Sequence, residues 1–149
     1  MLEIGQLAPL FELPDDSGRQ FLLASRRGSR MLLAFYPGDS TPVCTRQLCD
    51  YRDGIEEFSD LGVEVIGISG DGDASHRSFR AKYDLPFVLL SDTDLSVADA
   101  YGCKGLLGMK RGVFLINEQG LLQYLHVETM SLFRRSREEL LDVIRELDG

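Results

Sequence analysis

Among its 149 residues the sequence has no tryptophan, two histidines and three cysteines. Three cysteines are too few, and odd in number, for a small disulfide-stabilised scaffold. The closest pair is Cys44 and Cys49, whose C-x4-C spacing fits neither a zinc knuckle nor a C-x-x-C redox motif. Since both histidines lie far along the chain from this pair, we expect no metal site and no cofactor.

Positive charge is also scarce, since 16 Lys and Arg residues stand against 24 Asp and Glu, for a formal net charge of −8. An acidic chain repels nucleic-acid phosphates and anionic membrane surfaces, so we expect neither as a partner. No apolar run approaches the roughly 18 residues of a membrane span. The N-terminus has no basic segment of a secretory signal, and it carries Pro9. These absences predict a cytoplasmic protein.

Length and composition predict a single domain over residues 1–149, because 44% apolar residues suffice for one core and no repeat or linker interrupts the chain. Turn signals divide the chain into short apolar segments. The expected strands are Leu10–Leu13, Phe21–Ala24, Met31–Tyr36, Val63–Ser69, Phe87–Leu90, Val113–Ile116 and Leu121–Val127. The expected helices are Pro42–Asp60, Asp73–Tyr83, Leu95–Tyr101 and Ser136–Leu147.

The order of these segments predicts an α/β protein with a thioredoxin-like fold. Its middle part alternates strands and helices, which requires parallel strands joined by helical crossovers. The last two strands form a hairpin and add antiparallel pairing to the same sheet. We therefore expect a mixed central β-sheet flanked by helices, with the first two strands as an N-terminal hairpin extension.

The segment with the most chemistry runs from Tyr36 to Asp53, at the carboxyl end of a buried strand, where such sheets place ligand sites. Thr41 is a good N-cap and Pro42 a favoured first helical residue, so Cys44 becomes the third residue of a helix. Unpaired N–H groups and the helix dipole stabilise a thiolate there, so we expect a lowered pKa for this thiol. The Thr41 hydroxyl can reach the same turn, to hydrogen-bond the sulfur or a substrate oxygen.

Cys44 also begins an apolar helical stripe that continues through Leu48, Tyr51, Ile55 and Phe58. The thiol therefore faces the core rather than bulk water. Position alone leaves two interpretations open, which are a nucleophile in a partly dry pocket and a small, inert hydrophobic residue.

Cys49 lies about 140° around the helix from Cys44, which places the two Cα atoms roughly 8–9 Å apart. A disulfide needs Cα atoms within about 7 Å. The two thiols therefore cannot bond while the helix is intact, and any disulfide between them requires local unwinding.

The third cysteine and the two histidines have no partner in the sequence pattern. Cys103 lies in a predicted loop, and we assign it no role. His76 is expected on a helix face and His126 on a strand, neither of them as a ligand.

Pro37, Thr41 and Cys44 are spaced as P-x3-T-x2-C, which resembles the active-site motif of the peroxiredoxins, in the thiol-specific antioxidant family. The continuation to Asp53 carries Cys49 and is similar to the Q-type, or bacterioferritin-comigratory-protein, subfamily, whose second cysteine lies five residues on. Further family landmarks follow in order over nearly the whole chain, at Gly5–Pro9, Gly67–Asp71, Ser75–His76, Leu90–Asp92, Ala100–Gly102 and Arg111–Ile116.

The resemblance implies a thioredoxin-dependent peroxidase acting on hydrogen peroxide and organic hydroperoxides. Cys44 is then the peroxidatic residue and becomes a sulfenic acid, while Thr41 and Arg111 position the peroxide oxygens. Pro37 shapes the loop and shields the sulfur from water. Cys49 resolves the sulfenic acid as an intramolecular disulfide, which thioredoxin or a similar dithiol protein reduces. The subfamily also implies a monomer or weak dimer.

The sequence departs from the subfamily pattern at several positions. Gln47 stands where the subfamily usually has Glu, and Val113 where it usually has Ser or Thr. The helix position near Phe79–Arg80, which holds a resolving cysteine in some members, has none.

Two other functions fit a fold of this class. A thioredoxin-like disulfide oxidoreductase would need C-x-x-C and a proline before the hairpin strand, and both are missing from the sequence. A non-catalytic redox-sensing module would not need Thr41, Cys44 and Arg111 together.

Overall fold

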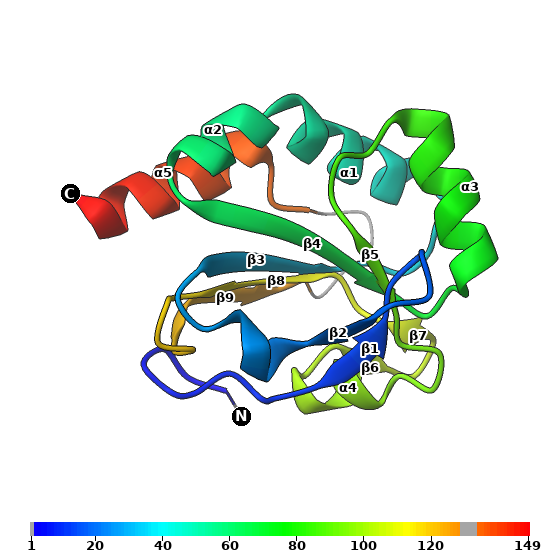
Figure 1. Ribbon diagram of the computed structural model, residues 1–149, viewed down its shortest axis with the longest axis horizontal. Coiled ribbons are helices and arrows are strands. Elements are labelled where there is room, and N and C mark those ends of the chain that lie inside the picture. The colour runs from blue at the N-terminus through cyan, green and yellow to red at the C-terminus, as the bar shows by residue number, and fades with distance from the viewer. Residues whose placement is uncertain (1, 129–133) are drawn as a thin grey trace.

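The computed structural model describes residues 2–128 and 134–149. Figure 1 shows a central sheet with α1, α2 and α5 on one side and α4 with the N-terminal segment on the other. The strands are β1 (Glu12–Pro14), β2 (Gln20–Leu22), β3 (Arg30–Phe35), β4 (Val63–Ser69), β5 (Leu89–Ser91), β6 (Lys104–Gly105), β7 (Gly108–Met109), β8 (Gly112–Ile116) and β9 (Leu122–Val127). The helices are α1 (Pro42–Asp53), α2 (Ile55–Asp60), α3 (Asp73–Tyr83), α4 (Ser96–Ala100) and α5 (Arg137–Asp148), with a short 3-10 helix at Leu23–Arg26.

The central sheet has the strand order β5-β4-β3-β8-β9. β3, β4 and β5 pair in parallel, whereas β8 and β9 add antiparallel pairs, as the sequence predicts. β1 and β2 form the predicted N-terminal hairpin. Every residue of β3 is buried, because this strand is central and both faces of the sheet are covered. The predicted mixed α/β architecture is confirmed.

Two apolar cores lie on opposite faces of the sheet, because successive strand residues point in opposite directions. Leu32 of β3 belongs to the core beneath α1, α2 and α5, and this core contains Cys44. The next residue, Leu33, belongs to the core formed with α4 and the N-terminal hairpin, and this one contains Cys103. The sheet therefore separates the two cysteines.

The helix predicted over Pro42–Asp60 is in fact two helices, which meet at Gly54. Glycine is a weak helix former, and the break also admits a neighbouring side chain. A Cβ atom on Gly54 would lie 2.9 Å from Cδ of Arg137. The predicted apolar stripe crosses this break and still faces inward, with Ile55 only half-buried.

The last helix begins as predicted, because Ser136 and Glu139 form a reciprocal capping box. Leu140, Leu141 and Ile144 are buried beneath it. Leu147 was predicted on the same apolar face but is 46% exposed, since the end of α5 projects beyond the sheet (Figure 1).

The segment after α4 contains a small β6–β7 hairpin that the sequence pattern does not predict. Its strands have two residues each, too short to show any periodicity. The turn between them places Leu106 and Leu107 fully in solvent. The strand predicted over Phe87–Leu90 is displaced towards the C-terminus, and β5 begins at Leu89.

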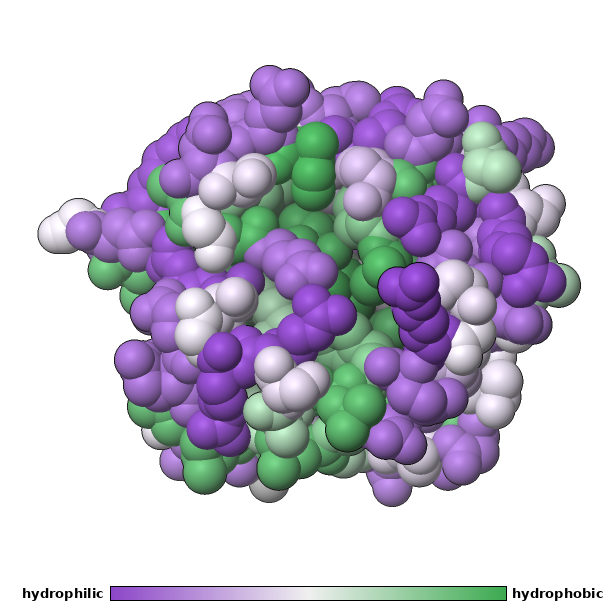
Figure 2. Space-filling view, in the orientation of Figure 1, coloured by the Kyte–Doolittle hydropathy of each residue, from purple (hydrophilic) through white to green (hydrophobic). Residues whose placement is uncertain are grey.

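Polar side chains dominate the face of the molecule in Figure 2, and apolar side chains gather in a hollow at its centre. Among the described residues, no helix combines the length and apolar character that crossing a membrane requires.

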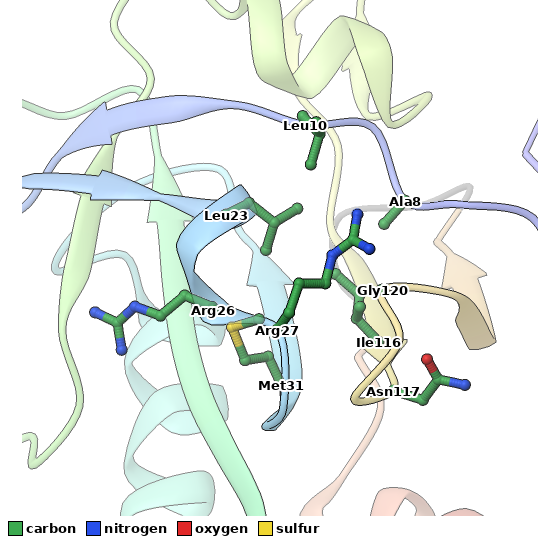
Figure 3. A pocket seen from close by; sticks show the side chains of 9 residues that line it. All are labelled: Ala8, Leu10, Leu23, Arg26, Arg27, Met31, Ile116, Asn117 and Gly120. Carbon is green, nitrogen blue, oxygen red and sulfur yellow. The ribbon is translucent and has the colours of Figure 1, made fainter.

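A small cavity lies beside the 3-10 helix and the β8–β9 turn (Figure 3). The Arg27 side chain reaches towards this turn and donates a hydrogen bond to the carbonyl oxygen of Gln119 at 3.0 Å. No predicted site residue lines the cavity, whose walls are Ala8, Leu10, Leu23, Arg26, Arg27, Met31, Ile116, Asn117 and Gly120. It is therefore separate from the chemistry predicted around Cys44.

Candidate active site

The start of α1 places Cys44 where the sequence predicts it. Thr41 is the N-cap, with extended backbone angles, and Pro42 is the first helical residue. Cys44 is then the third residue of the helix, and it has no solvent exposure. A peroxide can reach this sulfur only if side chains around it move.

Arg111 lies against Cys44, although 67 residues separate them in the chain. Its Nη1 donates to the Cys44 Sγ at 3.3 Å and to Oε1 of Gln47 at 2.5 Å. Arg111 precedes β8, and β8 pairs with β3 so that Phe35 lies opposite Gly112. Sheet pairing thus brings Arg111, which is 3% exposed, to the start of α1. A buried cation at this distance interacts favourably with a thiolate.

Gln47 extends this contact into a chain of hydrogen bonds through α1. Its Nε2 donates to the Tyr51 hydroxyl at 3.0 Å, and that hydroxyl donates to the carbonyl oxygen of Arg135 at 2.7 Å. The Gln47 amide therefore accepts from Arg111 at one end and donates to Tyr51 at the other. Gln47 stands where the subfamily usually has Glu. A neutral acceptor therefore replaces a carboxylate, and the contact with the Arg111 guanidinium is kept.

Thr41 and Pro37 lie on the surface at the entrance to the helix. The Thr41 hydroxyl donates to the carbonyl oxygen of Gly38 at 3.0 Å and makes no capping bond. The sequence allowed this hydroxyl to hydrogen-bond the Cys44 sulfur. In the structure its proton bonds within the loop instead. Pro37 is exposed in this loop, and its predicted shielding of the sulfur stays a prediction.

Cys49 is partly exposed, further along α1 from Cys44. Burial raises the pKa of its thiol, and the nearby Arg52 guanidinium acts in the opposite direction. All three cysteines are free thiols. This agrees with the expectation that the two cysteines of α1 stay apart while the helix is intact.

Cys103 lies in the core on the other face of the sheet and is also fully buried. Burial raises the pKa of its thiol to about 12. Its Sγ lies 3.9 Å from the carbonyl oxygen of Tyr101, a weak contact. The structure therefore does not bring Cys103 into the site around Cys44.

Sequence reasoning missed a polar cluster behind the loop that precedes α1. The Asp39 carboxylate accepts hydrogen bonds from the Tyr36 hydroxyl at 2.6 Å and from Ser75 Oγ at 2.8 Å, and His76 Nδ1 lies 2.8 Å from it. His76, which the sequence placed on a helix face, is wholly buried. The only signals were the family landmark at Ser75–His76 and the acid in the loop, and nothing in the sequence pairs them.

Comparison with known proteins gives consistent results. Residues 4–125 match the AhpC/TSA family. A curated protein of Coxiella burnetii, "Putative peroxiredoxin bcp", is 43% identical over 129 residues, which cover 81% of this chain and 85% of that protein. "Peroxiredoxin Q, chloroplastic" of Oryza sativa subsp. japonica is 43% identical over 125 residues, which cover 82% of this chain and 58% of that longer protein.

The solved structures include close matches to the fold. The crystal structure of peroxidoxin BcpB from Mycobacterium tuberculosis superposes with a TM-score of 0.90 at 29% sequence identity, and covers 100% of both chains. This match confirms the predicted thioredoxin-like fold. Together with the sequence matches it also confirms the predicted resemblance: the chain belongs to the AhpC/TSA family, as a peroxiredoxin of the Bcp and Q type.

Proposed function

We propose that the chain reduces hydrogen peroxide and organic hydroperoxides by thiol chemistry at Cys44. The Arg111 guanidinium 3.3 Å from the Cys44 sulfur, inside a closed core at a helix N-terminus, is the observation that carries this proposal. The thiolate attacks one peroxide oxygen, so that an S–O bond forms as the O–O bond breaks. Cys44 becomes a sulfenic acid, and the leaving group takes up a proton: an alkoxide from an organic hydroperoxide gives an alcohol, and hydroxide from hydrogen peroxide gives water.

Arg111 acts on both charged species in this step. Its cation stabilises the attacking thiolate and also the oxygen on which negative charge develops. Gln47 fixes the guanidinium, since its amide oxygen accepts from the same Nη1. Thr41 and Pro37 form the loop through which the peroxide enters, with the Thr41 hydroxyl able to turn from Gly38 to a substrate oxygen.

Cys49 completes the cycle in this proposal. Its thiolate attacks the sulfenic sulfur of Cys44, a disulfide forms, and the hydroxide that leaves is protonated to water. A thioredoxin-type dithiol then reduces the disulfide by two exchange steps. The helical geometry requires α1 to unwind first, which breaks the contact between Gln47 and Tyr51.

The remaining predictions are part of the same proposal. Residues 1–149 act as a single domain, which agrees with two cores that share one central sheet. The protein works in the cytoplasm as a monomer or weak dimer. The thioredoxin-like oxidoreductase alternative gains no support, because the sequence has neither C-x-x-C nor a proline before β8.

Peroxide consumption by the purified protein with thioredoxin and its reductase tests the proposal. We expect turnover in the wild type, none above background in Cys44→Ser, and a single oxidation without recycling in Cys49→Ser. Mass spectrometry after one equivalent of peroxide should find a Cys44–Cys49 disulfide. Turnover that persists in Cys44→Ser would refute the function, and a disulfide to Cys103 would refute the resolving role.

A further inference from the structure

The loop between β3 and α1 is anchored through one carboxylate. The Asp39 side chain is 3% exposed and meets three donors: Tyr36 from the residue after β3, and Ser75 and His76 from α3. Its backbone N–H also donates to Oδ2 of Asp71 at 2.7 Å. Asp39 therefore connects the loop to a strand end, to a helix and to the β4–α3 connection.

The protons on His76 follow from its two partners. Its Nε2 lies 3.1 Å from the carbonyl oxygen of Leu90, which can only accept, so this nitrogen carries a proton. Its Nδ1 lies 2.8 Å from the Asp39 carboxylate. Burial opposes ionisation of Asp39, but hydrogen bonds from His76, Tyr36 and Ser75 outweigh it and hold the pKa of Asp39 below its usual value. Each ring nitrogen of His76 therefore lies against an oxygen acceptor, the Asp39 carboxylate on one side and the Leu90 carbonyl on the other.

The neighbouring ionisable groups reinforce this arrangement. Burial, together with the Asp39 carboxylate, raises the pKa of Tyr36 well above its usual value, so the phenol keeps the proton it donates. Asp71, the other acid that faces the loop, accepts from Ser69 Oγ at 2.7 Å as well as from the Asp39 N–H.

The other histidine provides a contrast. His126 Nδ1 accepts from Nη2 of Arg135 at 3.1 Å, and its Nε2 faces the Glu128 carboxylate at 2.8 Å. One proton on Nε2 satisfies both contacts, and the side chain is 30% exposed. Only His76 is fully buried between two acceptors, and only His76 contacts the loop that leads to Cys44.

The anchored loop is strained. Ser40 has φ of 63°, a left-handed conformation that side chains other than glycine rarely adopt. Such residues persist only where the surrounding structure holds them, and they gather at functional sites. Ser40 lies between the anchored Asp39 and the N-cap Thr41, so the anchor and the helix start fix it from both sides.

We propose that His76, acting through Asp39, is a positioning residue that holds the strained loop and the first turn of α1 in the geometry in which Cys44 meets a peroxide. This rests on the proposed peroxidase function. The ring nitrogens of His76 contact Asp39 and Leu90, behind the loop, rather than the Cys44 sulfur. When its bond to Asp39 is lost, the loop keeps its backbone contact with Asp71 but loses the buried hydrogen bond that fixes the carboxylate.

The experiment compares two reactions of Cys44 in the full-length protein, followed by mass spectrometry. Oxidation by hydrogen peroxide needs the positioned site, whereas alkylation by iodoacetamide needs only that the side chains over the Cys44 sulfur move aside. In His76→Phe we expect peroxide oxidation to slow at least ~10-fold, as for a misplaced reacting group, with alkylation changed much less. His76→Asn, whose amide can donate to Asp39, should recover most of the rate. His126→Phe is the matched control and should leave both reactions unchanged.

Equal loss of both reactions in His76→Phe, or no loss of either, would overturn the positioning role. If His76→Phe does not fold, Ser75→Ala removes one donor at an exposed serine and should slow peroxide oxidation alone. An unchanged rate in Ser75→Ala together with Asp39→Asn would also refute the proposal. A wild-type Cys44 that reacts with peroxide no faster than a free thiol would instead refute the proposed function.

Discussion

Cys44 and Cys103 are two free thiols with the same burial and different surroundings. Both are 0% exposed, and they lie on opposite faces of one sheet. Cys44 begins a helix of 12 residues and receives a hydrogen bond from Arg111. Cys103 follows a helix of 5 residues, and burial raises the pKa of its thiol to about 12. Equal burial therefore does not make the two thiols equivalent, because Cys44 also has a charged donor and the N-terminus of a long helix beside it.

Two consecutive residues of one strand segment produce much of this difference. Arg111 points to the face that holds Cys44, and Gly112 points to the face that holds Cys103, as alternate strand residues must. Arg111 brings a cation to its cysteine. Gly112 brings no side chain, and a Cβ at this position would lie 2.7 Å from the Cys103 sulfur. One face thus places a cation against its cysteine, and the other packs tightly around its own cysteine.

Arg111→Met should have the largest effect on this comparison. Removal of the guanidinium should slow peroxide oxidation of Cys44 by about 10²–10³-fold, the usual loss for a donor to developing negative charge. Stopped-flow kinetics measures this rate, and thermal unfolding monitors the fold. Arg30→Met is the matched control, since Arg30 is also buried but pairs with Asp148 at the other end of the sheet. A similar loss of rate in both variants would contradict a specific role for Arg111.

Native alkylation should separate the two thiols directly. At pH 8 we expect iodoacetamide to label Cys44 in minutes and to leave Cys103 unlabelled for hours, because thiolate is the reactive form and Cys103 stays protonated. Peptide mass spectrometry measures both sites in one sample. In denaturant the two cysteines should react at rates within about threefold of each other, as free thiols do. Equal labelling in the native protein would remove the distinction.

Gly112→Ala should destabilise the tightly packed face of the sheet that holds Cys103. The added methyl meets Cys103 Sγ at 2.7 Å and the Phe114 ring at 3.2 Å, so we expect a loss of about 1–3 kcal/mol in the free energy of unfolding. Urea denaturation measures it. Cys103→Ala in the same chain should recover part of the loss. Gly72→Ala, where nothing lies within 4 Å, is the control and should cost much less.

Alkaline pH should reveal the smallest effect. The Cys103 thiol ionises near pH 8.5 in the unfolded chain and near 12 in the fold. Because its folded pKa is raised, the unfolded state loses this proton first, and stability falls as pH rises above about 8.5. The difference in unfolding free energy between wild type and Cys103→Ala should therefore shrink between pH 8 and 10. If the difference in unfolding free energy stays constant over this pH range, burial does not raise the pKa of Cys103 in the folded state.

Elements with strong local patterns were predicted well. β4 and α3 have the predicted bounds, since a continuous apolar run and a helical segment are readable from neighbouring residues alone. The start of α1 at Thr41 and Pro42 follows from the same local chemistry. The break at Gly54 was missed, because a single glycine does not reveal the Arg137 side chain that packs against it from another helix. The β6–β7 hairpin was missed because it is too short for any pattern.

The candidate site also contains residues that local spacing predicts and residues that only contacts between distant segments place. Cys44 at a helix N-terminus, and Cys49 out of its reach in an intact helix, follow from residue spacing. Arg111 was named only through a family resemblance, since its distance to the sulfur depends on the pairing of β8 with β3. Asp39 and His76 were not paired at all, because 37 residues separate them in the chain.

By itself the sequence determined the order of the main strands and helices, the helix capped by Thr41, and the placement of Cys44 in its first turn. Those features depend on interactions within a few residues, where backbone propensity and side-chain spacing suffice. Only the tertiary structure decided which cysteine meets a cation, which is packed against a glycine, and that a buried histidine holds the loop. Those outcomes depend on contacts between distant segments, which form only when the sheet brings them together.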